Sequence, residues 1–280
     1  MNLAQETKFL MNKYNIVASK SYGQNFLIDE NVVTSIVEKA DVNKDDLVIE
    51  IGPGLGNLTK YLVEKAGKVI SVELDKKMLQ ILNDRFSLYE NFELINDDIL
   101  KVDLKKLIAD NEYCSVKVVA NLPYYITTPI IMKLLEDNLK LKSITVMVQK
   151  EVAERLTEKP GGPDTGSITY SINYYTNPET IIDVPKESFI PSPKVDSAVI
   201  KLDLLEKPKV EVSDEKFFFK VIKSAFLQKR KTLINSLSNS GISDKDTLEK
   251  ILNELNIDLK VRAERLSLQD FANISDKLIK

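Results

Sequence analysis

A chain of 280 residues is long enough for one large domain and a smaller one. Its composition is that of an ordinary globular protein, 43% hydrophobic and 29% charged, and no apolar run is long enough to span a bilayer. There is no histidine and a single cysteine, Cys114, which excludes an internal disulfide, a cysteine metal cluster and any site built on histidine. Residues 1–20 lack the apolar core of a signal peptide, so we expect a cytoplasmic protein. Because histidine and a cysteine cluster are missing, we also expect it to work without a metal.

The first 37 residues predict two helices and the segment that connects them. Residues 1–20 are polar with scattered apolar positions, and we expect a short helix there. The next segment, 21–29, precedes apolar residues at helical spacing in 32–37. Asp29 and Asn31 are residue types that favour a helix N-cap, so from the residues alone this segment is interpreted as a helix lead-in.

Residues 47–59 predict a buried strand, a tight loop and the start of a helix. An apolar run that contains Glu50 is followed by three glycines, Gly52, Gly54 and Gly56. Glycine allows positive φ angles and the close approach of a bulky ligand, because it has no Cβ. Position 57 is Asn, so the dinucleotide pattern G-x-G-x-x-G fails, and a nucleotide-like ligand without a pyrophosphate fits better.

Glu73 supports the same ligand. It closes the strand expected at 69–73, about 20 residues beyond the first glycines, where a carboxylate can accept both hydroxyls of a ribose. A glycine loop after a strand is weak evidence alone, since a plain turn has the same pattern. Together with Glu73, the loop resembles the S-adenosylmethionine site of the Rossmann-like methyltransferases.

Helical and strand patterns alternate through the first half of the chain, which predicts an α/β fold with a parallel sheet. We expect strands at 47–51, 68–73, 92–96, 116–120 and 144–148, with helices at 59–65, 76–86, 104–109 and 129–138. Ligands of such sheets bind at the carboxyl ends of the strands. The polar residues at those ends are Glu50, Glu73, Asp97, Asp98 and Asn121.

Asp98 and Ile99 follow the strand expected at 92–96. An acceptor at this strand end can bind the exocyclic amine of an adenine, with Ile99 beside the ring and its backbone N–H facing a ring nitrogen. A polar turn is an equally good interpretation of these residues alone.

Residues 121–124, Asn-Leu-Pro-Tyr, carry the expected chemistry. An adenine amine is a poor nucleophile because its lone pair is delocalised into the ring. The Asn121 side-chain oxygen and the Leu122 carbonyl can accept hydrogen bonds from both of its N–H protons, while Pro123 fixes the local backbone. Tyr124 offers an aromatic face on which the base can stack. These groups would turn the lone pair toward an incoming methyl group.

A sulfonium cofactor already carries an activated methyl group, so the protein has mainly to align donor and acceptor. Taken alone, Asn-x-Pro-Tyr can be a simple proline turn. Downstream of the glycine loop and Glu73, in this order, it predicts methyl transfer to an amine.

The remainder of the chain divides in two. Strands expected at 180–184 and 198–204 complete the sheet as an antiparallel edge, after a Pro- and Gly-rich loop at 159–166. A linker at 207–209 then precedes helical patterns that continue to the end. We therefore expect a catalytic domain at 1–206 and a small all-helical domain at 207–280.

The net charge is −3, yet residues 216–243 hold six basic side chains and no acidic one. The stretch 226–233 is either the solvated face of an amphipathic helix or a surface that binds nucleic acid. The second interpretation assigns RNA contacts to Lys223, Lys229, Arg230 and Lys231.

Several stretches together resemble the ribosomal RNA adenine dimethyltransferases, specifically the bacterial small-subunit branch whose loss gives kasugamycin resistance. They are residues 23–27 (Gly-Gln-Asn-Phe-Leu), 50–56, 121–124, 189–199, 226–233 and 262–267. This resemblance covers nearly the whole chain. Lys229 and Ile234 stand where the family more often has Arg, which does not affect the chemistry.

The resemblance implies a class I methyltransferase fold and S-adenosylmethionine as cofactor, with Asn25 and Leu27 closing over it. The cofactor site implied by the motifs comprises Gln24, Asn25, Leu27, Glu50, Gly52, Gly54, Glu73, Leu74, Asp98, Ile99 and Asn121. The catalytic residues are Asn121, Leu122, Pro123 and Tyr124.

The implied reaction is the dimethylation of N6 of two adjacent adenosines in the 3′-terminal hairpin loop of small-subunit (16S) rRNA, within an immature small ribosomal subunit. Unpaired loop bases can be turned into a pocket at reduced cost. Three alternatives remain: a macrolide-resistance enzyme acting on large-subunit rRNA, a DNA adenine methyltransferase, and a ribosome-assembly factor for which methylation is secondary. No heptad pattern is apparent, so we expect a monomer.

Overall fold

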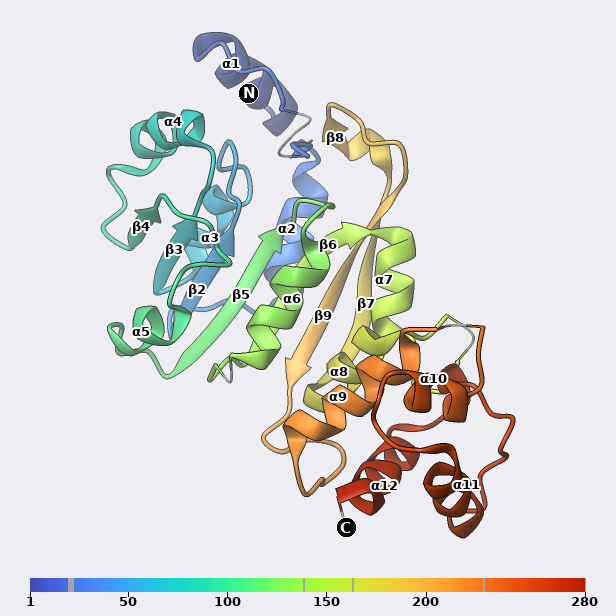
Figure 1. Cartoon of the computed structure of the whole chain (residues 1–280). Helices are drawn as coiled ribbons and strands as arrows, with labels where there is room; N and C mark the ends of the chain where they lie inside the picture. Colours follow the sequence, from blue (N-terminus) through green and yellow to red (C-terminus); the bar gives the residue numbers. More distant parts are fainter. Residues whose placement is uncertain (20–22, 138, 163, 229, 280) are drawn as a thin grey trace. The chain divides into compact units, whose positions relative to one another are not determined.

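The computed structural model describes residues 1–19, 23–137, 139–162, 164–228 and 230–279. They form two compact units, each built from two segments of the chain (Figure 1). The first unit comprises Met1–Glu154 with Pro178–Leu204, and the second comprises Arg155–Asn177 with Leu205–Lys280.

The first unit is built on a seven-stranded sheet in the order β4-β3-β2-β5-β6-β9-β7. Its strands are β2 (Asp46–Ile51), β3 (Lys68–Val72), β4 (Phe92–Ile95), β5 (Ser115–Asn121), β6 (Ser143–Gln149), β7 (Thr176–Val184) and β9 (Ser197–Leu204). Strands β2 to β6 are parallel, and β9 runs antiparallel to β6. The predicted parallel sheet and its antiparallel addition are confirmed. The parallel strands β2, β3 and β5 are neighbours and end at the same edge of the sheet.

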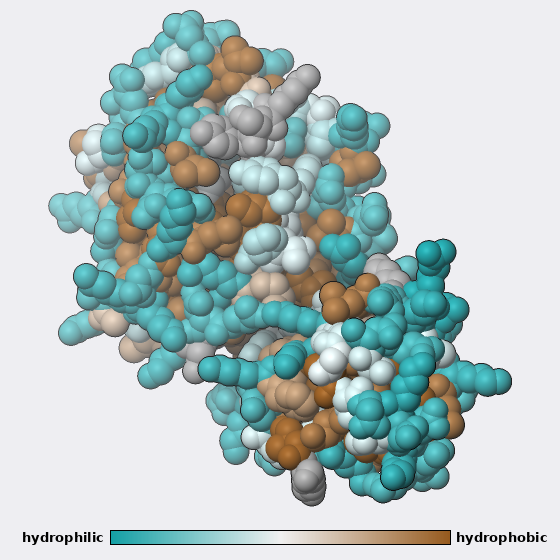
Figure 2. Space-filling model, in the orientation of Figure 1, coloured by the Kyte–Doolittle hydropathy of each residue, from teal (hydrophilic) through white to brown (hydrophobic). Residues whose placement is uncertain are grey.

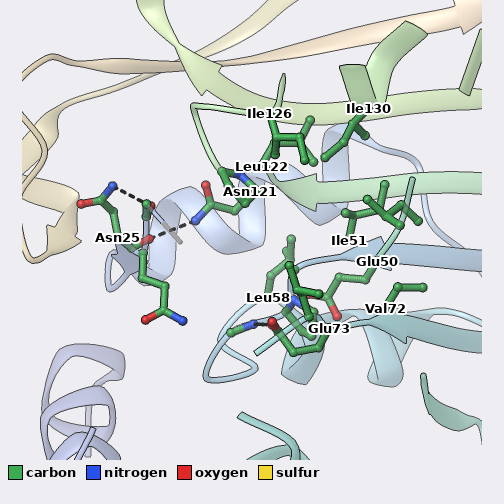
Figure 3. A pocket seen from close by; sticks show the side chains of 18 of the residues that line it. Asn25, Glu50, Ile51, Leu58, Val72, Glu73, Asn121, Leu122, Ile126 and Ile130 are labelled. Atoms are coloured by element: carbon green, nitrogen blue, oxygen red, sulfur yellow. Dashed lines mark hydrogen bonds between the residues drawn. The ribbon is translucent and has the colours of Figure 1, made fainter. Parts of the chain in front are cut away.

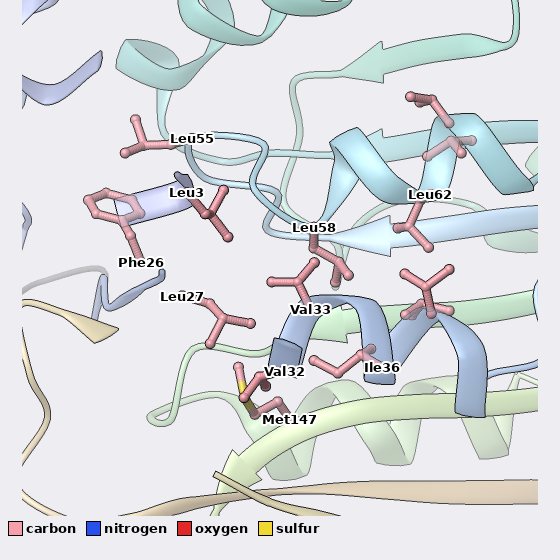
Figure 4. Close-up of a cluster of buried hydrophobic side chains, with 14 of the residues drawn as sticks. Leu3, Phe26, Leu27, Val32, Val33, Ile36, Leu55, Leu58, Leu62 and Met147 are labelled. Carbon is pink, nitrogen blue, oxygen red and sulfur yellow. The ribbon is translucent and has the colours of Figure 1, made fainter. Parts of the chain in front are cut away.

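Helices cover both faces of this sheet, so its central strands β2, β3, β5 and β6 are buried along most of their length, as in other parallel sheets. The helices of the unit are α1 (Leu3–Lys13), α2 (Glu30–Lys39), α3 (Thr59–Lys65), α4 (Lys76–Phe86), α5 (Leu104–Ala109) and α6 (Thr127–Glu136), and α7 (Lys150–Thr157) leads into the second unit. One face packs against α2, α3 and α4, where Val33, Ile36 and Leu62 meet (Figure 4). Asp29 is the N-cap of α2, as the helix lead-in predicts.

A short two-stranded sheet was not expected from the sequence. Strand β1 (Phe26–Leu27) pairs antiparallel with β8 (Phe189–Ile190), which follows the 3-10 turn η1 (Lys186–Ser188). Phe26 and Leu27 are both buried. The pairing joins two of the stretches that carry the family resemblance.

The second unit is helical but starts earlier than predicted. It contains α8 (Ser167–Tyr175), α9 (Glu215–Phe226), α10 (Leu233–Asn239), α11 (Lys245–Glu254), η2 (Ala263–Arg265) and α12 (Leu268–Ile279). The predicted boundary at 206/207 falls close to Leu204/Leu205, but residues 155–177 also belong to this unit. The reason is aromatic packing: the ring of Tyr170 in α8 lies edge-on to the ring of Phe271 in α12, with 4.9 Å between the ring centroids.

Hydrophilic side chains cover much of the face shown in Figure 2, with hydrophobic ones between them. Among the described residues, no helix is both long and apolar enough to cross a membrane.

Candidate functional site

A cavity of about 1080 Å³, open mouth included, lies in the first unit at the carboxyl ends of β2, β3 and β5. Glu50 and Ile51 enter it from β2, Val72 from the end of β3, and Asn121 from the end of β5 (Figure 3). This is the edge of a parallel sheet at which ligands bind.

The residues predicted for the cofactor and for catalysis all line this one cavity. They are Gln24, Asn25, Leu27, Glu50, Gly52, Gly54, Glu73, Leu74, Asp98, Ile99, Asn121, Leu122, Pro123 and Tyr124. Segments up to a hundred residues apart in the chain therefore converge, while the role of each residue stays a prediction.

The glycine loop is held against Glu73. Its three glycines have positive φ angles, of 67° at Gly52, 58° at Gly54 and 81° at Gly56. The Gly54 N–H donates to Glu73 Oε2 at 3.0 Å, and the Asp75 N–H donates to Glu73 Oε1 at 2.7 Å. A Cβ at Gly54 would lie 3.3 Å from the Phe26 ring, so the ring would have to shift by a few tenths of an ångström, and the positive φ would add strain.

Glu50 lies deeper than Glu73 and is almost fully buried. Its Oε2 accepts hydrogen bonds from the Thr59 hydroxyl at 2.7 Å and the Ser71 hydroxyl at 2.6 Å. Burial raises the pKa of Glu50 to about 7, and it also raises the pKa of Glu73. The cavity thus contains two carboxyl groups whose ionised forms a positively charged ligand would favour.

Asn121 is oriented by the segment before α2. Its Nδ2 donates to the Asn25 carbonyl over 3.2 Å, and the Asn25 amide donates to the Gly23 carbonyl at 3.2 Å (Figure 3). The nitrogen of Asn121 is therefore engaged with Asn25, which leaves its oxygen available to accept a hydrogen bond.

Tyr124 is anchored at its hydroxyl, which lies 2.6 Å from the Ser197 hydroxyl at the start of β9. Burial raises the pKa of this phenol. A hydroxyl held in this way fixes the position of the outer end of the ring.

The other predicted cofactor residues already have partners in the fold. Gln24 donates from Nε2 to Asp75 at 2.9 Å. Asp98 accepts the Leu100 N–H at 3.0 Å, as in a polar turn, and Ile99 beside it is buried. Both interpretations of this strand end are therefore compatible: Asp98 shapes a turn and also lines the cavity.

Sequence reasoning missed part of the cavity wall. Tyr125, Ile126 and Ile130 line it, and Tyr125 is exposed at 58% although it directly follows the predicted motif. Ile126 is the N-cap of α6 and Ile130 lies four residues later in the first turns of the helix, a spacing that could have identified them. Leu58, at the start of α3, also lines the cavity.

The predicted RNA-binding residues belong to the second unit. Lys223 is exposed in the last turn of α9, and Arg230 and Lys231 are exposed after it. Helix α9 ends at Phe226 and α10 begins at Leu233, so the stretch 226–233 is not the face of one helix. Lys229 lies outside the described residues.

Comparisons with known proteins agree on one family. The model of the family described as "Ribosomal RNA adenine dimethylase" matches residues 16–280. A protein of Alkaliphilus oremlandii named "Ribosomal RNA small subunit methyltransferase A" is 46% identical over 99% of this chain and 97% of its own. A protein of the same name from Clostridium acetobutylicum is 49% identical over 97% of this chain and 98% of its own.

Solved structures are similar in fold. A dimethyladenosine transferase from Plasmodium falciparum superimposes with a TM-score of 0.73 at 26% identity, covering 88% of this chain and 94% of that chain. The 23S rRNA methyltransferase ErmE reaches a TM-score of 0.69 at 24% identity, covering 91% of this chain and all of that chain, which supports the fold alone.

Proposed function

Because this chain belongs to the ribosomal RNA adenine dimethylase family, we propose that it transfers two methyl groups to N6 of each of two adjacent adenosines in the 3′-terminal hairpin loop of small-subunit rRNA. It is an rRNA adenine dimethyltransferase, and its methyl donor is S-adenosylmethionine. The observation that carries the proposal is the convergence of Asn121–Tyr124 with the glycine loop and Glu73 on one cavity.

The acceptor groups and the glycine loop of the cavity suit S-adenosylmethionine. Glu73 accepts the ribose hydroxyls, and the positive φ at Gly52 and Gly54 lets the backbone approach the ligand closely. Asp98 accepts from the adenine amine, with Ile99 beside the ring. The buried carboxyl of Glu50 complements the positive charge of the methionine part.

S-adenosylmethionine supplies a methyl group on a positively charged sulfur, which needs no further activation. The protein positions the nucleophile. Asn121 Oδ1 and the Leu122 carbonyl accept the two protons of N6 and turn its lone pair toward the methyl group. Tyr124, held by Ser197, stacks on the base. Each transfer would form an N–C bond as the S–C bond of the donor breaks, leaving S-adenosylhomocysteine, and N6 would release one proton to water. After the first transfer one N–H remains, and one of the two acceptors still holds the amine for the second.

The names of the relatives and the access to the base support this choice of substrate. Proteins that are 46–49% identical over nearly the whole chain are named "Ribosomal RNA small subunit methyltransferase A". The target bases lie in a loop, where flipping costs less than in a duplex. Lys223, Arg230 and Lys231 of the second unit contact rRNA phosphates in this proposal, and the chain acts as a monomer on an immature small subunit late in its assembly.

A transfer assay tests this function. Labelled S-adenosylmethionine is incubated with unmodified small subunits, with large subunits, and with the Asn121→Ala variant in parallel. Asn111→Ala is the matched control, because it removes an asparagine that accepts a hydrogen bond from Lys68 and does not line the cavity. We expect label on small subunits with the wild-type and control proteins and none with Asn121→Ala. Label on large subunits alone would move the enzyme to the resistance branch, and tight subunit binding without label would leave an assembly factor.

A further inference from the structure

Helix α1 packs behind the glycine loop without reaching the cavity. Leu3, Thr7 and Leu10 of α1 are buried, and Leu3 and Leu10 share a hydrophobic cluster with Leu55 and Leu58 of the loop region (Figure 4). Of the described residues that line the cavity, none belongs to α1. Any effect of this helix on the cofactor must therefore pass through the loop.

An arginine of α4 connects the loop to α1. The Arg85 guanidinium donates from Nη1 to the Leu55 carbonyl of the loop and from Nη2 to Glu6 Oε1 of α1, at 2.5 Å. The same Nη1 lies 3.4 Å from Asn57 Oδ1. The Arg85 side chain is only 10% exposed, so its charge depends on the Glu6 carboxylate for compensation.

A second connection runs through Asn57, at the end of the loop. Its Nδ2 donates to the Thr7 hydroxyl of α1 at 2.8 Å and to the Leu27 carbonyl of β1 at 2.8 Å. Leu27 itself lines the cavity. Helix α1, the glycine loop and the segment expected to close over the cofactor therefore share one buried polar network.

The loop needs such support because of its composition. Glycines at 52, 54 and 56 lose more backbone entropy on ordering than any other residue would. On the cavity side, Glu73 fixes the loop through the Gly54 N–H at 3.0 Å. Arg85, which is not among the described residues that line the cavity, fixes it through the carbonyl of Leu55, the next residue. The two contacts hold the peptide groups that precede and follow the Gly54–Leu55 peptide.

We propose that the Glu6–Arg85 ion pair is a positioning device that couples helix α1 to the affinity for S-adenosylmethionine. With the pair intact, the glycine loop is preorganised to receive the cofactor. Without it, binding must also order the loop, so affinity falls while the transfer step at Asn121 is unchanged. This inference rests on the proposed function, since it takes the cavity to be the cofactor site.

Affinity measurements on two single variants test the coupling. Glu6→Gln keeps the shape of the side chain and removes its charge. Tyr14→Phe is the control, because it removes a 2.7 Å hydrogen bond between α1 and Asp84 of α4 without touching the loop. We expect Glu6→Gln to raise the Kd for S-adenosylmethionine about fivefold, with kcat at saturating cofactor within about twofold of wild type. Tyr14→Phe should leave the Kd unchanged.

Hydrogen exchange gives a second readout, and its first comparison, the wild-type chain with and without cofactor, needs no variant. Coupling is reciprocal, so the cofactor must stabilise α1 if α1 stabilises the cofactor site. We expect saturating S-adenosylmethionine to slow amide exchange in Leu3–Lys13, and we expect Glu6→Gln to remove that slowing.

The outcomes separate this inference from the proposed function. If the wild-type chain binds the cofactor, three results would overturn the coupling and leave the proposed function standing. They are an unchanged Kd in Glu6→Gln, an equal loss of cofactor affinity in Tyr14→Phe, and amide exchange in α1 that does not change when the cofactor is added. A wild-type chain that binds no S-adenosylmethionine would overturn the proposed function and the coupling together.

Discussion

The side-chain amide of Asn121, at the end of β5, donates to the main-chain carbonyl of Asn25 over 3.2 Å. These residues are far apart in the sequence, yet both line the cavity. The bond engages the nitrogen of the Asn121 amide and leaves its oxygen as an acceptor, which in the proposed reaction is the end that faces the substrate. Catalysis in this account depends on that orientation.

Replacing Asn121 tests the orientation. We expect Asn121→Ala to lower kcat about a hundredfold or more, with a small change in the KM for S-adenosylmethionine. Asn121→Asp should fail as well, because a carboxylate has no N–H to donate to Asn25. Steady-state kinetics with saturating rRNA measures both variants, and an aspartate variant with wild-type kcat would show that the bond to Asn25 is unnecessary.

Glu73 gives a prediction on cofactor binding. Its carboxylate is buried and accepts two backbone N–H groups, from Gly54 and Asp75. Removing it loses the ribose acceptor and leaves those donors unpaired, so Glu73→Ala should raise the Kd for S-adenosylmethionine about 30-fold.

Calorimetry measures this change in Kd. Glu73→Gln is the matched control, since the amide oxygen keeps one acceptor, and it should lose less affinity than the alanine variant. Equal affinity in Glu73→Ala and wild type would remove Glu73 from the cofactor site.

Much of the first unit follows from local pattern. Alternating apolar runs and helical spacings predict β2 to β6, because a parallel sheet buries whole strands and the signal is strong in each one. Polar residues at strand ends then locate the cavity, because the carboxyl ends of parallel strands lie at one edge of the sheet. Glu73 and Asn121 both line the cavity at that edge.

The rest depends on contacts that no local pattern carries. Pairing of Phe26–Leu27 with Phe189–Ile190 joins segments far apart in the chain, and each strand has only two residues. Helix α8 is placed in the second unit by Tyr170, whose hydroxyl bonds the carbonyls of Ala263 and Leu266 at 3.1 and 2.6 Å. Such long-range packing explains why the predicted boundary at 206/207 misses residues 155–177.

Glu50 gives a prediction for stability against pH. Burial raises its pKa from 4.5 to about 7, so the folded chain binds a proton here that the unfolded chain has lost. The free energy of unfolding therefore decreases as pH rises from about 4.5 to about 7, by roughly 3 kcal/mol for this group. Below about 4.5 the carboxyl is protonated in both states and has no such effect.

Glu50→Gln isolates this effect, because the amide oxygen can still accept from Thr59 and Ser71. We expect the variant to match wild type at pH 4.5 and to be more stable at pH 8, as measured by urea unfolding. An identical pH profile for both proteins would show that folding does not shift the pKa of Glu50.

The basic residues of the second unit give a prediction on salt dependence. Replacing Arg230 and Lys231 with Ala should weaken binding to small subunits and reduce the slope of log K against log salt by about 2, since two phosphate contacts are lost. The affinity for S-adenosylmethionine should not change. Lys245→Ala with Lys250→Ala removes the same charge elsewhere in the unit and is the control. Equal slopes in both double variants would make the stretch 226–233 an ordinary solvated surface.

The measurement that tests the central claim most directly is the location of the methyl groups. Small subunits lacking the modification are incubated with the wild-type enzyme and S-adenosylmethionine, and the rRNA is digested and analysed by mass spectrometry. The account predicts two adjacent N6,N6-dimethyladenosines in the 3′-terminal hairpin loop and no other new modification. Methyl groups confined to another part of the small-subunit rRNA, or to large-subunit rRNA, would contradict it.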